Sequence, residues 1–263
     1  MRKPLIPRPG SSRATTAFSP TNSNTRLLVG PAGRGRPSDT AQHSSTMVNL
    51  GLNSDRSRGM MLERLRQQGI TDERVLAAMM AVPRHAFVDQ GLASRAYEDA
   101  ALPIGYGQTI SQPWVVARML AVVCENGVPE KVLEVGAGCG YQTAVLAHLS
   151  REVHAIERIR GLYDLAREQL GRMRLPGRIR LSHGDGMEGR PGAAPFDAII
   201  VAAAGAVIPQ ALLQQLKLGG RLIAPEGTTS QKLVVVQRTG PASWQRDELE
   251  AVRFVPLRAG VQR

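Results

Sequence analysis

The stretch VLEVGAGCGY at residues 132–141 decides the fold of this 263-residue chain. A short apolar strand, Lys131–Val135, is followed directly by Gly136, Gly138 and Gly140, after which a helix begins. In an open α/β sheet, nucleotide-like ligands bind at such a junction, beyond the carboxyl end of a strand. Because glycine has no Cβ atom, it permits the tight turn and a close approach of backbone to ligand. The stretch therefore predicts a ligand-binding α/β sheet.

Strands and helices alternate on the C-terminal side of this turn. The apolar patterns predict strands at 131–135, 153–157, 179–182, 196–203, 220–225, 232–238 and 252–256, and helices at 140–149, 160–173 and 209–217. This order implies right-handed crossovers between parallel strands. We therefore expect a mostly parallel, seven-stranded sheet with helices on both faces.

Two segments precede the predicted sheet. Residues 1–46 are rich in Ser, Thr, Pro, Gly, Asn and Arg without an apolar period, which predicts a disordered basic tail. The tail has the Arg- and Ser-rich composition of a transit peptide, but an unstructured tail or a start at Met47 or Met60 is the simpler interpretation. Residues 47–263 are expected to form one domain. Its helical part, 47–125, contains an irregular stretch at 84–113 that predicts a functional loop, and 131–263 is the ligand-binding core.

Composition excludes several classes of function. The net charge is +11, but the tail has seven basic side chains against Asp39 alone, so the rest is only mildly basic and predicts no nucleic-acid partner. No segment approaches the roughly 18–20 apolar residues of a membrane-spanning helix. The two cysteines, Cys124 and Cys139, form no C-x-x-C metal spacing and are typical of a reducing, cytoplasmic setting. No metal site is expected.

Acidic side chains follow three successive predicted strands. The G-x-G-x-G spacing differs from the G-x-G-x-x-G of dinucleotide folds, in which a helix N-terminus binds pyrophosphate. S-adenosylmethionine has no phosphate, but it has an ammonium group for Glu134 and ribose hydroxyls for Glu157. Asp185, beside Gly186, would accept a hydrogen bond from the adenine amino group. The simpler alternatives are a surface ion pair of Glu157 with a neighbouring arginine and an ordinary Asp-Gly turn at Asp185.

Longer motifs resemble one family. They are ALPIGYGQTISQPWVVARML (101–120), VLEVGAGCGYQTAVLA (132–147), GDG (184–186), APFDAIIV (194–201), GGRLIAPEG (219–227) and VRFVPL (252–257). Together they resemble the protein-L-isoaspartate (D-aspartate) O-methyltransferases over residues 61–257. The glycine-rich turn is common to many methyltransferases, whereas GQTISQP (107–113) and VRFVPL are more specific to this family.

The resemblance implies a Rossmann-like class I methyltransferase fold and a repair enzyme. Such an enzyme transfers a methyl group from S-adenosylmethionine to the free carboxylate of L-isoaspartyl residues, and less well of D-aspartyl residues, in damaged proteins. The expected form is a cytoplasmic monomer. The expected cofactor residues are Glu134, Gly136, Gly138, Gly140, Glu157, Asp185 and Gly186.

The acceptor residues are also implied by the resemblance. Ser111 would be the catalytic residue, and the expected substrate-binding residues are Gln108, Thr109, Ile110, Val252, Phe254, Val255 and Pro256. On local grounds, Ser111 is also a candidate helix N-cap before Pro113, and 252–256 a plain packing strand. Two positions depart from the family pattern: Ala202 lacks a hydroxyl, and Cys139 replaces a small serine.

Two other functions compete with this one. The chain could be a methyltransferase for another substrate, but AAAGAVIP (202–209) lacks the Pro-Pro-aromatic segment of amino-directed nucleic-acid enzymes, and neither cysteine follows a proline. The second is a non-catalytic module that binds S-adenosylmethionine. Preferred protein substrates cannot be predicted from the residues.

Overall fold

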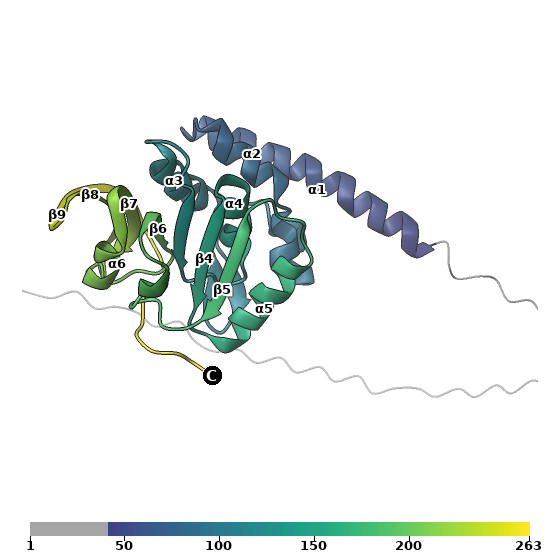
Figure 1. The fold of residues 1–263 in the computed structure, drawn as a ribbon. Coiled ribbons are helices and arrows are strands. Elements are labelled where there is room, and N and C mark those ends of the chain that lie inside the picture. The colour runs from purple at the N-terminus through teal and green to yellow at the C-terminus, as the bar shows by residue number, and fades with distance from the viewer. Residues whose placement is uncertain (1–41) are drawn as a thin grey trace, which may run out of the picture. The chain divides into compact units, whose positions relative to one another are not determined.

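The computed structural model describes residues 42–263, which form an α/β domain (Figure 1). Residues 1–41 of the predicted tail lie outside the described residues. The first helix, α1 (Gln42–Gln67), begins within the last five residues of that predicted tail. The segment from Gln42 to Leu50 contains no glycine or proline to interrupt a helix.

Seven strands form the main sheet, as the sequence predicts. Their order is β5-β4-β3-β6-β7-β8-β9. The strands from β5 to β7 are parallel, and β8 and β9 complete the sheet as an antiparallel meander. The bounds are β3 Lys131–Val135, β4 Glu152–Glu157, β5 Arg178–His183, β6 Phe196–Val201, β7 Leu216–Glu226, β8 Gln231–Gly240 and β9 Ser243–Val252.

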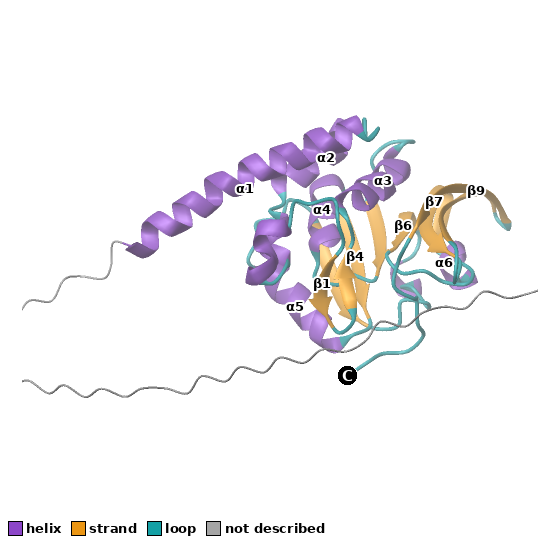
Figure 2. Ribbon diagram, turned by 180° about the vertical axis from the view of Figure 1, so that it is seen from behind, coloured by secondary structure: helices purple, strands orange, loops and turns teal. Residues whose placement is uncertain are grey.

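Alternation along the central strands directs apolar side chains to both faces of the sheet. In β6, Ala198 and Ile200 join one buried cluster, whereas Ile199 and Val201 join the other. The first cluster also includes residues of α1, α2 (Glu73–Ala81), α3 (Pro113–Cys124), α4 (Tyr141–Leu149) and α5 (Arg160–Gly171). The second includes Leu212 of α6 (Gln210–Gln214). Helices therefore cover both faces, as expected (Figure 2).

The predicted irregular stretch contains short ordered elements. Two 3-10 helices, η1 (Arg84–Phe87) and η2 (Gln90–Arg95), precede a hairpin of β1 (Leu102–Gly105) and β2 (Gln108–Ile110). The hairpin is a separate two-stranded sheet, and its tip is Gly105-Tyr106-Gly107, all with positive φ. Sequence patterns missed it because the strands are only four and three residues long. A third 3-10 helix, η3, spans Pro191–Ala193.

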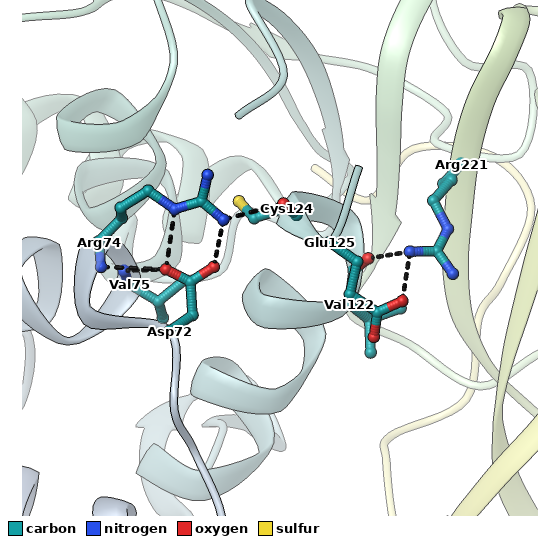
Figure 3. A network of polar contacts seen from close by, with 7 residues as sticks. All are labelled: Asp72, Arg74, Val75, Val122, Cys124, Glu125 and Arg221. Carbon is teal, nitrogen blue, oxygen red and sulfur yellow. Dashed lines mark hydrogen bonds and ion pairs between the residues drawn. The ribbon is translucent and has the colours of Figure 1, made fainter. Parts of the chain in front are cut away.

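The C-terminal end of α3 is held by two arginines from neighbouring elements (Figure 3). Arg74 of α2 donates to the carbonyl of Cys124 at 3.0 Å, and Arg221 of β7 donates to the carbonyl of Val122 at 2.5 Å. Asp72 orients Arg74 through contacts of 2.7 and 3.0 Å. Cations at a helix C-terminus stabilise its partial negative charge. These contacts fix α3, whose other end follows the GQTISQP stretch.

The predicted last strand at 252–256 is wrong. The seventh strand is β9, Ser243–Val252, and only Val252 belongs to both. β9 is an edge strand whose side chains are mostly exposed and polar, so its sequence carries no apolar alternation. Similarly, the helix predicted at 209–217 ends at Gln214, because β7 begins at Leu216 rather than Gly220.

The chain beyond β9 is extended but pairs with side chains and loops instead of the sheet. The backbone N–H of Phe254 donates to the Gln231 side chain at 2.6 Å, and the Gln231 amide donates back to the Phe254 carbonyl at 3.2 Å. Ala204 then bonds Val255 and Leu257 at 2.8 and 2.7 Å. We call residues 253–262 the C-terminal strap, because its residues 255–258 and Gln262 line the cavity described next.

Candidate active site

A cavity of about 410 Å³ lies where β3 and β4 end. The hairpin tip, the glycine-rich turn, the start of α5 and the C-terminal strap all line it. The predicted site residues on its wall are Gln108, Thr109, Ile110, Ser111, Glu134, Gly136, Gly138, Glu157, Gly186, Val255 and Pro256. The carboxyl ends of parallel strands are where an open α/β sheet binds its ligand. The structure thus brings most of the predicted residues together.

The glycine-rich turn is held against the end of β4. The backbone N–H groups of Gly136 and Ala137 both donate to the carbonyl of Ile156, at 2.9 and 3.0 Å. Gly136 and Gly140 both have φ of +89°, a left-handed conformation that favours glycine. A side chain at Gly140 would also lie 3.2 Å from Leu170. Gly140 therefore supports the turn from behind and does not line the cavity.

Glu134 is a fully buried carboxylate on the cavity wall. Its oxygens accept hydrogen bonds from Gln142 at 3.1 Å and from Thr143 at 2.5 Å, both in α4. Burial raises the pKa of Glu134 to about 8; the hydrogen bonds from Thr143 and Gln142 oppose this shift, and the nearby carboxylate of Glu157 adds to it. A ligand cation beside Glu134 would supply the missing opposite charge.

Glu157 ends β4 and holds the turn. One carboxylate oxygen accepts from the backbone N–H of Gly138 at 2.9 Å, and the other accepts from Ile159 at 2.8 Å. Burial raises its pKa above the usual range, although these two backbone donors oppose the shift. Each oxygen retains a lone pair for a hydroxyl donor. No ion pair of Glu157 with Arg158 or Arg160 forms.

Asp185 is placed differently from the other two carboxylates. It does not line the cavity, although its neighbour Gly186 does. One oxygen accepts from the backbone of Met187 at 2.8 Å, as in an ordinary Asp-Gly turn. The other accepts from Gly260 at 2.5 Å and so holds the C-terminal strap. The predicted contact of Asp185 with the adenine amino group is not supported by these two hydrogen bonds.

A second hollow, of about 330 Å³, adjoins the cavity. We call it the acceptor groove; its lining includes Val252 and Phe254. The two hollows share a wall made of Thr109, Ser111, Ala202 and Val255. The cavity and the groove therefore meet at this wall.

Ser111 stands on the shared wall with a free hydroxyl. The helix N-cap is its neighbour Gln112, whose carbonyl accepts from Val116 at 3.2 Å. Asp99 supplies the side-chain cap by accepting from the backbone N–H of Trp114 at 3.2 Å. Among the described residues, the Ser111 hydroxyl has no hydrogen-bond partner. The Ser111 hydroxyl is therefore not used to cap helix α3.

Comparison with known sequences identifies the family. A sequence model described as protein-L-isoaspartate(D-aspartate) O-methyltransferase matches residues 56–262. A protein-L-isoaspartate O-methyltransferase of Bordetella parapertussis is 67% identical, with 100% of both chains covered. This chain belongs to the protein-L-isoaspartate (D-aspartate) O-methyltransferase family. The isoaspartate methyltransferase of Burkholderia vietnamiensis is 50% identical, over 98% of this chain and 84% of that one.

Solved structures agree with this family and with its donor. A protein-L-isoaspartate O-methyltransferase superposes with a TM-score of 0.68 at 26% identity, covering 78% of this chain and 67% of that one. A Plasmodium falciparum protein described as the same enzyme, in complex with S-adenosyl-L-homocysteine, has a TM-score of 0.66 at 26% identity and covers 76% and 97%. The methyl donor of the family is S-adenosylmethionine.

Several wall residues of this isoaspartate methyltransferase fold were missed from the sequence. They come from the hairpin tip and the C-terminal strap and include Tyr106, Leu257, Arg258 and Gln262. Gln262 forms a parallel bridge beside Ile159. The hairpin tip and the C-terminal strap lie more than 140 residues apart in sequence, and no local pattern indicates that both line the cavity. The available signals were the two family motifs that contain Tyr106 and Leu257, ALPIGYGQTISQPWVVARML and VRFVPL.

The two departures from the family pattern both lie at the cavity. Cys139 is buried in the turn, and burial raises the pKa of its thiol to about 11, which makes it a spacer and not a nucleophile. Ala202 stands on the shared wall with only its methyl group. The described residues contain no cluster of three or more metal-ligating side chains.

Proposed function

We propose that the cavity binds S-adenosylmethionine and that the acceptor groove binds an L-isoaspartyl peptide, whose carboxylate is methylated at the shared wall. The function is that of the family, a protein-repair methyltransferase. The single observation that carries the residue-level proposal is Ser111. Its unpaired hydroxyl lies where the cavity and the groove meet.

The donor half has one candidate partner for the ammonium group of the cofactor and one for its ribose hydroxyls. Glu134 would bind the ammonium, because a buried carboxylate gains most from an opposite charge. Glu157 would accept from the ribose hydroxyls with its remaining lone pairs. Gly136 and Gly138 would let the backbone contact the methionine part. Asp185 would act indirectly, by holding the strap over the cavity.

The acceptor half needs to position a carboxylate, not to deprotonate it. An isoaspartyl carboxylate is ionised at neutral pH, so no general base is required. When bound, the donor supplies an electrophilic methyl group: the carboxylate oxygen forms the new C–O bond, the C–S bond breaks, and its electron pair neutralises the sulfonium. The Ser111 hydroxyl would donate to the second carboxylate oxygen and align the first. Gln108, Thr109 and Ile110 form the wall around it.

The remaining substrate contacts come from the last residue of β9 and from the strap. Val252, Phe254, Val255 and Pro256 line the groove or its shared wall and would lie beside the substrate backbone. A mainly apolar lining and exclusion of water favour a reaction in which opposite charges cancel.

A paired-peptide assay tests the function. One peptide has isoaspartate and the other has aspartate at the same position, and transfer of a radiolabelled methyl group is measured. Only the isoaspartyl peptide should be labelled. Equal labelling of both peptides, or binding of S-adenosylhomocysteine without any transfer, would favour the competing functions instead.

Replacement of Ser111 tests the residue-level proposal. Ser111→Ala should lower kcat about 10- to 100-fold, by removing one donor at the reacting group. Its affinity for S-adenosylhomocysteine, measured by calorimetry, should not change. Ser182→Ala in β5, which removes a hydroxyl that bonds the Ala155 carbonyl, is the matched control. A loss of cofactor affinity in Ser111→Ala would make Ser111 structural.

We further propose a cytoplasmic monomer that acts on damaged proteins and not on nucleic acid. Both cysteines are free and buried, which is compatible with a reducing compartment. No helix among the described residues has the length and apolar character needed to cross a bilayer. Sedimentation of the full chain, with and without duplex DNA, tests the monomer and the absence of nucleic-acid binding.

A further inference from the structure

The acceptor groove has one charged side chain. Among the described residues that line it, every side chain except Arg253 is apolar or uncharged. Arg253 is exposed and forms no hydrogen bond or ion pair with any described residue. By contrast, Arg118 of α3 is paired with Glu250 at 2.8 Å. A free guanidinium is therefore presented to whatever occupies the groove.

The position of Arg253 separates it from the reacting carboxylate. Ser111 and Val255 line both hollows, whereas Arg253 lines only the groove and so stands off the wall where donor and acceptor meet. Pairing the reacting carboxylate would also slow the reaction, because its charge disappears in the transition state. An anion elsewhere on the substrate keeps its charge throughout.

We propose that Arg253 selects substrates in which an acidic residue flanks the isoaspartyl site. This specificity rests on the proposed function, since it assigns a second anchor in the same groove. A flanking carboxylate pairs with the guanidinium in both the ground and transition states, so it raises kcat/KM through KM and leaves kcat unchanged. The pair is exposed, so its effect is modest and weakens with salt.

Two pairs of isoaspartyl peptides test this proposal. In one pair the residue before isoaspartate is Glu or Gln, and in the other pair the residue after it is Glu or Gln. At low ionic strength, the wild-type enzyme should prefer Glu about two- to fivefold in kcat/KM on at least one side. The preference should disappear in Arg253→Gln and at high salt, and it should persist in Arg253→Lys.

The controls separate this proposal from the proposed function. Arg174→Gln, which removes an exposed arginine that lines neither hollow, should keep the preference. Because Arg253 has no hydrogen-bond or ion-pair partner among the described residues, Arg253→Gln should fold with an unchanged Tm. Equal use of Glu and Gln peptides by the wild type, or a preference that survives in Arg253→Gln, would overturn the proposal. Failure of the wild type to methylate even the Gln peptides would instead contradict the proposed function.

Discussion

The donor and acceptor halves of this site are built in different ways. The wall of the donor cavity has a local part, made of the ends of β3 and β4 and the turn between β3 and α4, within residues 134–157, and the hairpin tip and the C-terminal strap complete it. The acceptor groove uses the hairpin end, the start of α3, the end of the edge strand β9 and the start of the C-terminal strap. The polar residues of the donor half therefore lie mostly on one local strand-and-turn unit. The acceptor groove has no such unit and exists only because distant segments are held together.

The substitution with the largest expected effect tests whether cofactor affinity depends on the carboxylates that line the cavity. Glu157→Ala removes both bonds that hold the turn at Gly138 and Ile159. We expect S-adenosylhomocysteine to bind about 100-fold more weakly, since hydrogen bonds to a charged group contribute about 1.5–3 kcal/mol each. Asp185→Ala should weaken binding about fivefold or less, because it acts only through the strap. If calorimetry gave equal losses of affinity in Glu157→Ala and Asp185→Ala, Asp185 would be a direct contact of the cofactor.

A second test uses the pKa of Glu134. Its folded pKa of about 8 lies above the ordinary value of a glutamate, so below pH 8 the apo carboxyl is largely protonated. Binding an ammonium requires the ionised form, so affinity should rise by up to about tenfold per pH unit as pH increases toward 8. Glu134→Gln should flatten this profile in calorimetric titrations.

The same group has an opposite effect on the stability of the apo protein. Between the ordinary pKa of a glutamate and about 8, the unfolded state is ionised while the folded state stays protonated. The unfolded state therefore binds fewer protons, and the free energy of unfolding should fall as pH rises through this window. Denaturant titrations should show a smaller fall in Glu134→Gln. An identical pH dependence in both proteins would contradict the burial argument.

A third test concerns the hairpin tip that covers the cavity. Tyr106 lies directly over Gly161 of α5, where an added Cβ atom would overlap the phenol ring. Gly161→Ala should displace Tyr106 and weaken cofactor binding about three- to tenfold, although alanine favours the helix by about 1 kcal/mol. In a Tyr106→Gly background, the same substitution should have no further effect. Additive losses would mean that the two residues act separately.

The smallest expected effect is at Cys139. Because burial raises its thiol pKa to about 11, almost no thiolate exists at neutral pH. Cys139→Ser should change kcat/KM by less than about twofold, since it replaces one small side chain with another. Iodoacetamide should leave the native enzyme active. Rapid inactivation of the wild type, but not of Cys139→Ser, would show that the turn opens.

Sequence patterns were most accurate where structure is local. The bounds of β3 are as predicted; β4 and α4 differ by one residue at their start, and β5 differs by one residue at each end. Buried parallel strands are nearly continuous apolar runs, so they are visible in sequence. The polar edge strand β9 and the short hairpin were missed, because neither alternates apolar and polar residues over enough length.

The sequence by itself determined the turn, the sheet around it and the two carboxylates, Glu134 and Glu157, on the donor wall. Only the tertiary structure decided that Asp185 bonds the strap instead of lining the cavity. It also decided that Gln112 is the N-cap of α3, which leaves the Ser111 hydroxyl without a partner among the described residues. Finally, it placed Arg253 as the one charged side chain among the described residues that line the groove. The physical reason is that apolar periodicity reports which residues are buried. The partner of a polar group depends on segments that only folding brings within hydrogen-bond distance.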